Sequence, residues 1–110
     1  MDNIQQRRND NVRNVLKSGQ RPYVLKVNRH NTKEHEKFKV LKMFELIWEG
    51  NEVFSEAELQ CGGRADLYVS DINTCYEILM SETEEQLREK TKNWTCEVIG
   101  IKIKKKDVKQ

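Results

Sequence analysis

Three short apolar runs that each carry acidic residues follow one another in the stretch VFSEAELQCGGRADLYVSDINTCYEILM, residues 53–80. Gly62-Gly63 and Asp71-Ile72-Asn73 are turn signals between them, so the stretch predicts strands over residues 53–60, 65–70 and 74–80. A carboxylate inside an apolar strand costs stability unless something binds it. The stretch therefore predicts a sheet with a cation site, and a divalent metal is the simplest cation for several carboxylates.

Helical patterns lie on both sides of these strands. Asn31 and Glu34 have capping-box spacing and Gly50 is a stop signal, so we expect a helix over about residues 32–49. Ser81 and Glu84 have the same spacing and predict a second helix that ends at residue 92 or 93. The apolar stripe of the first helix, which we expect to be core, consists of Phe38, Leu41, Met43 or Phe44, Ile47 and Trp48.

The remaining segments complete one α/β domain. The first residues predict a short helix that ends near Leu16 and Lys17, and residues 22–27 predict a short strand or an extended arm. The alternating run 96–103 predicts a final strand. From residue 32 onward the order is helix, three strands, helix, strand, which is typical of an α/β sandwich on a mixed sheet.

Composition limits the class of protein. The 110 residues are 36% apolar and 35% charged, which suits one domain with a modest core, and we expect a homodimer that buries more surface. No apolar run approaches the roughly 20 residues that span a bilayer, and the N-terminus lacks a signal-peptide core. We therefore expect an intracellular, cytoplasmic protein without membrane contact. Cys61, Cys75 and Cys96 form no C-x-x-C pair, so we expect reduced thiols rather than a disulfide framework, a structural zinc site or a cysteine nucleophile.

Charge is unevenly distributed, although the net charge is only +2. Residues 1–30 contain seven Lys and Arg against two Asp, and the last fourteen residues contain five Lys against one Glu and one Asp. The middle of the chain is therefore acidic. Basic ends beside an acidic centre suit phosphate-backbone contacts near a metal site, and solvated termini explain the same pattern.

The period of the strands places the carboxylates. Residues two apart on a strand share a face, so Glu56 and Glu58 share one face of the first strand. If the first turn is Cys61–Gly63, Glu58 lies directly across from Asp66, and Glu77 of the third strand joins them. Three converging carboxylates favour Mg²⁺ or Mn²⁺ over zinc. The alternative is that this face is the solvated side of the sheet.

These residues resemble a known family. The segments GRADL (63–67), YEI (76–78) and SETEE (81–85) are similar to the core of the PD-(D/E)xK nuclease superfamily, and within it to small archaeal Holliday-junction resolvase-like nucleases. The resemblance covers about residues 32–103. It implies a restriction-endonuclease-like α-β-β-β-α-β core with a mixed central sheet flanked by helices, and a DNA endonuclease that depends on Mg²⁺ or Mn²⁺.

The resemblance also implies roles for single residues. Asp66 and Glu77 would ligate the metal together with the backbone carbonyl of Ile78. Glu58 or Glu56 would supply the additional acidic ligand that some members have, and His35 would support the site from the first helix. A lone histidine is more often a surface residue, which is the alternative for His35.

One position departs from the family's pattern. The motif's lysine should follow Glu77 by two residues, where this chain has Leu79. A leucine cannot orient the attacking water or stabilise charge that develops on the phosphate. We expect Lys90 on the second helix to replace it as a catalytic residue, because the lysine has migrated to this helix in some members. The alternative is that Lys90 is a solvated charge.

The chain divides on this view into a basic N-terminal arm (residues 1–30), a nuclease-like core (31–103) and a lysine-rich tail (104–110). DNA is the expected partner, without a nucleotide cofactor, and the residues expected to contact it are Arg7, Arg8, Arg13, Lys104, Lys105 and Lys106. Two other functions remain open. One is a catalytically inactive nuclease fold that binds nucleic acid, and the other is a small module that binds proteins through a sheet edge or a helix face.

Overall fold

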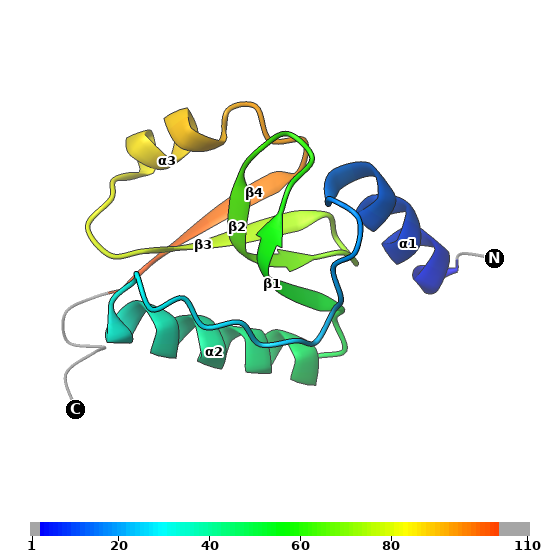
Figure 1. Cartoon of the computed structure of the whole chain (residues 1–110), viewed down its shortest axis with the longest axis horizontal. Helices are drawn as coiled ribbons and strands as arrows, with labels where there is room; N and C mark the ends of the chain where they lie inside the picture. Colours follow the sequence, from blue (N-terminus) through cyan, green and yellow to red (C-terminus); the bar gives the residue numbers. More distant parts are fainter. Residues whose placement is uncertain (1–2, 104–110) are drawn as a thin grey trace.

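A computed structural model describes residues 3–103, and its fold is of the predicted α/β class (Figure 1). The elements are α1 (Ile4–Val15), α2 (Lys33–Trp48), β1 (Val53–Glu58), β2 (Arg64–Val69), β3 (Thr74–Leu79), α3 (Glu84–Thr91) and β4 (Glu97–Lys102). The predicted order from residue 32 onward is confirmed. The lysine-rich tail, with Lys104, Lys105 and Lys106, lies outside the described residues.

The strands form one mixed sheet in the order β1-β2-β3-β4. β1, β2 and β3 pair antiparallel through short turns, whereas β4 runs parallel to β3, since α3 and its connections return the chain to the starting end of β3. In Figure 1, α2 lies below the strands and α3 above them. α2 packs against β1, β2 and β3, and α3 packs against β4.

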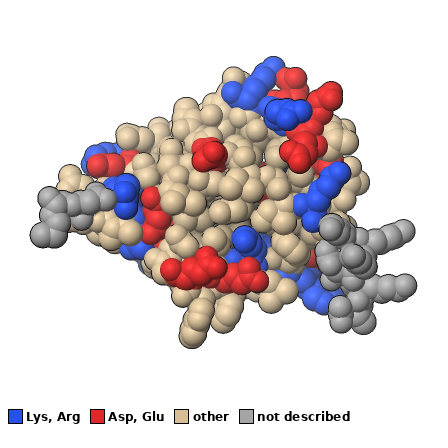
Figure 2. All heavy atoms as spheres, turned by 180° about the vertical axis from the view of Figure 1, so that it is seen from behind, with Lys and Arg blue, Asp and Glu red and all other residues tan. Residues whose placement is uncertain are grey.

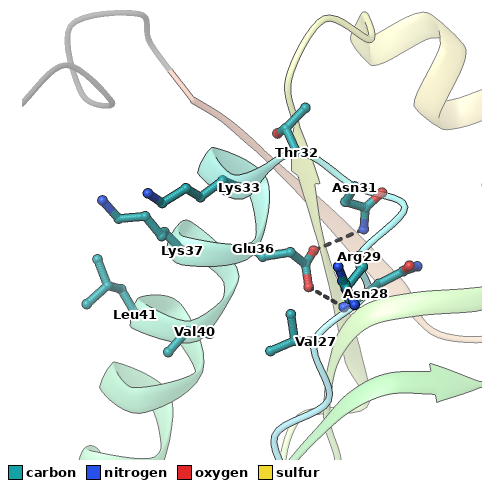
Figure 3. Close-up of a pocket in the computed structure, with 10 residues that line it drawn as sticks. All are labelled: Val27, Asn28, Arg29, Asn31, Thr32, Lys33, Glu36, Lys37, Val40 and Leu41. Carbon is teal, nitrogen blue, oxygen red and sulfur yellow. Dashed lines mark hydrogen bonds between the residues drawn. The ribbon is translucent and has the colours of Figure 1, made fainter.

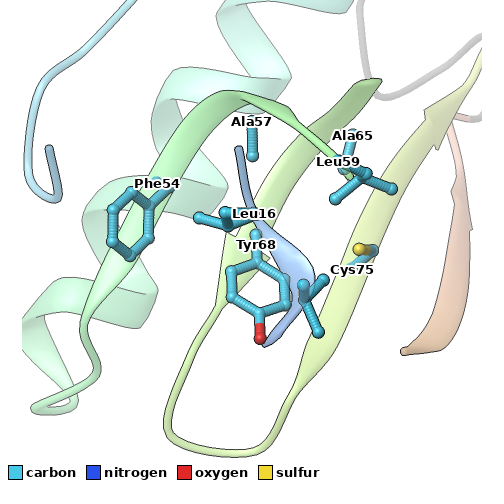
Figure 4. Close-up of a cluster of buried hydrophobic side chains, with 8 residues drawn as sticks. Leu16, Phe54, Ala57, Leu59, Ala65, Tyr68 and Cys75 are labelled. Atoms are coloured by element: carbon cyan, nitrogen blue, oxygen red, sulfur yellow. The ribbon is translucent and has the colours of Figure 1, made fainter. Parts of the chain in front are cut away.

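Two clusters of buried side chains fill the two faces of the sheet. On the α2 face, Met43 and Leu46 pack with residues of β1 and β2. On the other face, the end of α1 inserts into a second cluster, which consists of Val15, Leu16, Phe54, Ala57, Leu59, Ala65, Tyr68 and Cys75 (Figure 4). Leu16 also forms a β-bridge with Leu59. The segment predicted as a basic arm thus contributes two residues to the core.

Both predicted capping boxes were misplaced by one or two residues. α2 is capped by Thr32, whose hydroxyl accepts a hydrogen bond from the His35 amide, rather than by Asn31. α3 is capped by Thr83, which exchanges both capping-box bonds with Gln86, so the helix begins later than Ser81. Each segment contains two overlapping candidate caps, and the structure uses the later one in both.

The predicted apolar stripe of α2 was only partly right: Met43 is buried and Ile47 packs against the same cluster, but other predicted members are exposed. The side chains that α2 buries are His35, Glu36, Lys39, Met43 and Leu46. Leu41 is 60% exposed, Phe44 62% and Trp48 82%. The inward face of the first half of the helix is charged, because its charges are paired with each other and with the sheet, so burial does not leave them unsatisfied.

The predicted register between the first two strands was also wrong. The turn comprises the five residues 59–63, so Glu58 lies across from Arg64 rather than from Asp66. Glu56 has a φ of +48°, and this irregular position breaks the alternation of the strand. Phe54, Ala57 and Leu59 consequently share one cluster, although simple alternation would place Phe54 on the other face (Figure 4). The segment 22–27 is not a strand of the sheet: residues 22 and 23 form a turn in which Tyr23 has a φ of +66°. The segment is hydrogen-bonded to β1 through Val53 and Ser55.

Candidate active site

Asp66 of β2 and Glu77 of β3 lie side by side in the sheet. The register that pairs Leu67 with Tyr76 brings them together. The Asp66 amide donates to Glu77 Oε2 at 2.7 Å, and the Ile78 amide donates to Asp66 Oδ2 at 2.8 Å. Each carboxylate is therefore oriented by the backbone of the neighbouring strand.

The environment of Glu77 favours a nearby cation. The side chain is only 2% exposed, and burial raises the pKa of its carboxyl above the ordinary value. The negative charge of Asp66 raises this pKa further, and the ammonium of Lys90 opposes the shift without cancelling it. Two coupled carboxylates in such a setting gain stability from positive charge placed between or beside them.

Lys90 reaches this pair from α3. Its Nζ lies 2.8 Å from Oε1 of Glu77, and its side chain is 52% exposed. Burial lowers the pKa of Lys90, but the hydrogen bond and charge of Glu77 outweigh burial and raise it. Leu79, which stands where the family's motif has lysine, is buried. The site thus has an ammonium group beside Glu77 although the strand provides none.

His35 contacts the same pair from α2. Its Nε2 lies 3.3 Å from Oδ2 of Asp66, and its Nδ1 lies 2.7 Å from Oε2 of Glu36. Burial lowers the pKa of His35, but hydrogen bonds and charges of Asp66 and Glu36 outweigh this effect and raise it. The imidazole is therefore held between two carboxylates, and the predicted supporting residue lies at the site rather than on the surface.

A buried charge cluster, formed by Glu36, Lys39 and Glu56, continues from His35 under the sheet. Lys39 is fully buried, and its Nζ lies 2.6 Å from Glu36 Oε1 and 2.7 Å from Glu56 Oε2. Burial raises the pKa of Glu36, but hydrogen bonds from Lys39, Asn28, Asn31 and His35 outweigh it and lower this pKa to about 2. Glu36 is thus ionised at neutral pH, and the contacts of Lys39 with Glu36 and Glu56 join α2 to β1.

Glu36 and Lys39 were not predicted from the sequence. The signal available in the sequence was helical spacing. His35, Lys39 and Met43 follow one another at intervals of four residues, so all three lie on one face of α2. Glu56 was predicted as a supporting acidic residue. Its carboxylate contacts Lys39 of α2 and the Arg64 side chain, and among the described residues no contact joins it to Asp66 or Glu77.

The expected set of three metal-binding carboxylates is not formed. Glu58 is exposed beside Arg64, and residues 3–103 contain no group of three or more His, Cys, Asp or Glu side chains arranged for a metal ion. The pair Asp66 and Glu77 still fits Mg²⁺, which proteins often hold through one or two carboxylates, with waters and substrate phosphate as the other ligands. The contacts of Oδ2 with the Ile78 amide and with His35 fix the orientation of the Asp66 carboxylate. Its other oxygen, Oδ1, has no hydrogen-bond partner among the described residues.

A pocket of about 590 Å³ lies between α2 and the segment 27–32 (Figure 3). Val27, Val40 and Leu41 give it apolar walls, and basic side chains, including Lys33 and Lys37, surround it. Glu36 points from this pocket toward Asn28 and Asn31, to which it is hydrogen-bonded. The pocket therefore adjoins the buried charge cluster through Glu36.

The N-terminal arginines differ in their surroundings. Arg8 donates to Asp71 at 2.8 Å and to the Gly50 carbonyl at 2.9 Å, and it is mostly buried, so it fastens α1 to the sheet. Arg13 is exposed and pairs with Asp10 of its own helix. In the view from behind, basic and acidic side chains lie next to one another around the margin of the face, so its described residues form no broad basic surface (Figure 2).

Comparisons with known proteins give no family for this chain, because no family model, no curated protein and no solved structure matches it. In the described part of the chain, no helix has the length and apolar character that a membrane crossing requires.

Proposed function

We propose that the chain is a metal-dependent DNA endonuclease of the PD-(D/E)xK type, in which Lys90 takes the place of the motif's lysine. The observation that carries the proposal is the contact of 2.8 Å between Lys90 Nζ and Glu77 Oε1. Asp66, Glu77 and a lysine come together at one end of a mixed sheet, which the family resemblance requires. The element order of residues 33–102 supports the same proposal.

Asp66 and Glu77 would hold the divalent metal, which when bound polarises a phosphate oxygen and lowers the pKa of the attacking water. The Lys90 ammonium is half exposed and held by Glu77, so it can place positive charge beside a phosphate. His35 holds Oδ2 of Asp66 and leaves Oδ1 for the metal. Glu36 in turn fixes the orientation of the imidazole through Nδ1.

DNA would be held by its phosphates, with specificity for DNA structure rather than sequence. Arg7 and Arg13 of α1 and the tail lysines Lys104 to Lys106 remain candidates for these contacts. Arg8 is a weaker candidate, because its guanidinium is bonded to Asp71 and Gly50.

The test is cleavage of labelled linear, single-stranded and four-way-branched DNA in Mg²⁺ or Mn²⁺, with Asp66→Ala as the control. We expect metal-dependent cleavage that is absent in the variant. The proposal would be contradicted if the folded native protein cut none of the three substrates. It would also be contradicted if Asp66→Ala still cut them.

The second candidate is a nuclease fold that binds nucleic acid without cutting it. The specific observation in its favour is the same Lys90–Glu77 pair, because the ammonium already supplies a cation to the coupled carboxylates. Calorimetric titration with Mn²⁺ separates the two candidates. The endonuclease binds the metal and loses this binding in Glu77→Gln, whereas the inactive fold binds DNA and no metal.

The exposed face of α2 favours self-association as a homodimer. Leu41, Phe44 and Trp48 follow one another at helical spacing, are all more than half exposed, and the last two stack with ring centroids 5.9 Å apart. A symmetric contact would bury this stripe against its own copy, because a two-fold interface uses the same patch on both partners. Light scattering should give the mass of a dimer, and Trp48→Lys should give that of a folded monomer. A monomeric native chain would contradict the homodimer.

A further inference from the structure

Two cysteines that are far apart in the sequence meet between β3 and β4. Cys75 lies near the start of β3, and Cys96 immediately precedes β4. Their sulfur atoms are 2.8 Å apart. Cys75 is fully buried in the cluster of Figure 4, and Cys96 is half-buried at its edge. The third cysteine, Cys61, is exposed in the turn between β1 and β2.

This pair needs little movement to form a bond. An S–S bond is about 2.05 Å long, so the two sulfur atoms are less than about 1 Å from bonding distance. β3 and β4 are hydrogen-bonded parallel neighbours over residues 74–79 and 97–102, and that pairing fixes the approach of the two side chains. The bond can therefore form in the folded protein without a change of strand order or register.

We propose that Cys75 and Cys96 form a reversible oxidative modification site, at which a peroxide converts the two thiols into an intramolecular disulfide. This inference is independent of the proposed nuclease function. It uses two residues that the candidate active site does not use, and it requires only the sheet geometry described above.

The oxidation takes two steps. The Cys96 sulfur attacks a peroxide oxygen, the O–O bond breaks, and Cys96 becomes a sulfenic acid while hydroxide leaves and takes up the thiol proton as water. The Cys75 sulfur then attacks the Cys96 sulfur, the S–S bond forms, the S–O bond breaks, and a second water leaves with the Cys75 proton. The two thiols lose two electrons in total, the peroxide gains them, and a dithiol reductant reverses the change.

Cys96 is the residue that reacts first. It is partly accessible, whereas Cys75 has no exposed surface. The hydrogen bond from Cys75 also lowers the pKa of the Cys96 thiol, which increases its thiolate fraction. The buried Cys75 then acts as the resolving thiol. Such a pair captures a sulfenic acid before peroxide can oxidise it further.

The test uses the reduced full-length chain with hydrogen peroxide, and counts free thiols under denaturing conditions. We expect the count to fall from three to one, with a Cys75–Cys96 peptide found by mass spectrometry and three thiols restored by dithiothreitol. Cys61→Ser is the matched control, because Cys61 is exposed and takes no part in the sulfur contact between Cys75 and Cys96, and it should fall from two thiols to none. Cys96→Ser should keep its Cys75 thiol.

Three results would overturn the proposal. One is a folded native chain that keeps all three thiols after peroxide, and another is a disulfide that contains Cys61 or links two chains. The third is oxidation of Cys96 to sulfinic acid without pairing. Circular dichroism checks the fold of each variant, and if Cys96→Ser does not fold, the thiol count and peptide map of the native chain and of Cys61→Ser decide.

Discussion

Replacing Glu36 by Gln tests whether the buried charge cluster stabilises the fold. The pKa of Glu36 falls from 4.5 to about 2 in the folded chain, and this difference corresponds to about 3 kcal/mol of stability at neutral pH. The glutamine keeps the size of the side chain and removes the charge that Lys39 and His35 bind. We therefore expect the free energy of unfolding of Glu36→Gln to be lower by about 3 kcal/mol at pH 7.

The pH dependence gives a second, sharper expectation. A carboxyl whose pKa is lower in the folded state stabilises the fold above its unfolded pKa, and this stability is lost as the pH falls through the folded pKa. Because Glu36 helps to raise the pKa of His35, the difference between native chain and variant should grow somewhat as His35 becomes protonated below neutral pH. The contribution of the Glu36 carboxyl itself should then shrink as the pH falls from 4.5 toward 2. Only the native chain loses this contribution, because the variant has no group there to titrate.

Urea unfolding at 25 °C measures both effects. With a slope of about 1–3 kcal/mol per molar, the midpoint of Glu36→Gln should lie roughly 1–3 M lower at pH 7. Glu34→Gln is the matched control, since Glu34 is exposed in the same first turn of α2 and shares the helix-dipole effect, which is worth at most about 1 kcal/mol. Equal losses in both variants, or a loss from Glu36→Gln that does not change between pH 7 and pH 3, would refute the reasoning.

Two further predictions concern how the helices are attached. Asp71 and Arg8 form a mostly buried ion pair, so Asp71→Asn, which leaves the guanidinium without its carboxylate, should cost about 3 kcal/mol at pH 7 in urea unfolding. Burial raises the pKa of Asp71, but Arg8 and the Glu52 amide outweigh burial and lower it, so this cost should shrink as the pH falls below the ordinary Asp pKa of about 4. An unchanged cost at acid pH would contradict this. At Gly100 an added Cβ would lie 2.7 Å from Leu87 Cδ2 and 2.8 Å from Leu79 Cδ1. Gly100→Ala should therefore lower the free energy of unfolding by about 1–3 kcal/mol in the same urea experiment. Native-like stability of this variant would show that α3 shifts freely on β4.

Much of the fold follows from local signals. The three central strands are short, rich in apolar and β-branched residues and separated by Gly and Asp-Asn turns, so their order and approximate bounds were predicted correctly. The closeness of Asp66 and Glu77 follows from the short 70–73 turn, which fixes the register of β2 on β3. The presence of Lys90 at Glu77 depends only on where α3 crosses the sheet, and the resemblance pointed to this residue in advance.

The errors have a common physical cause. On α2 the apolar residues were assigned to the core. Lys39 pairs with Glu36 and Glu56, so a charged face of the helix can be buried without leaving a charge unpaired. Phe44 and Trp48 remain exposed. On β1 the positive φ of Glu56 and the five-residue turn moved Glu58 away from Asp66. Both features depend on contacts between residues distant in sequence, which periodicity does not contain.

The most direct test of the central claim compares DNA cleavage by Lys90→Met and Lys92→Met in Mg²⁺. Both lysines lie at the end of α3 and are more than half exposed, but Lys92 pairs with Glu89 of its own helix, whereas Lys90 reaches Glu77. If Lys90 stabilises charge at the phosphate, its loss should slow cleavage at least about 100-fold, and Lys92→Met should cut at the native rate. Equal rates in the two variants would contradict the assignment of Lys90 and with it the proposed active site.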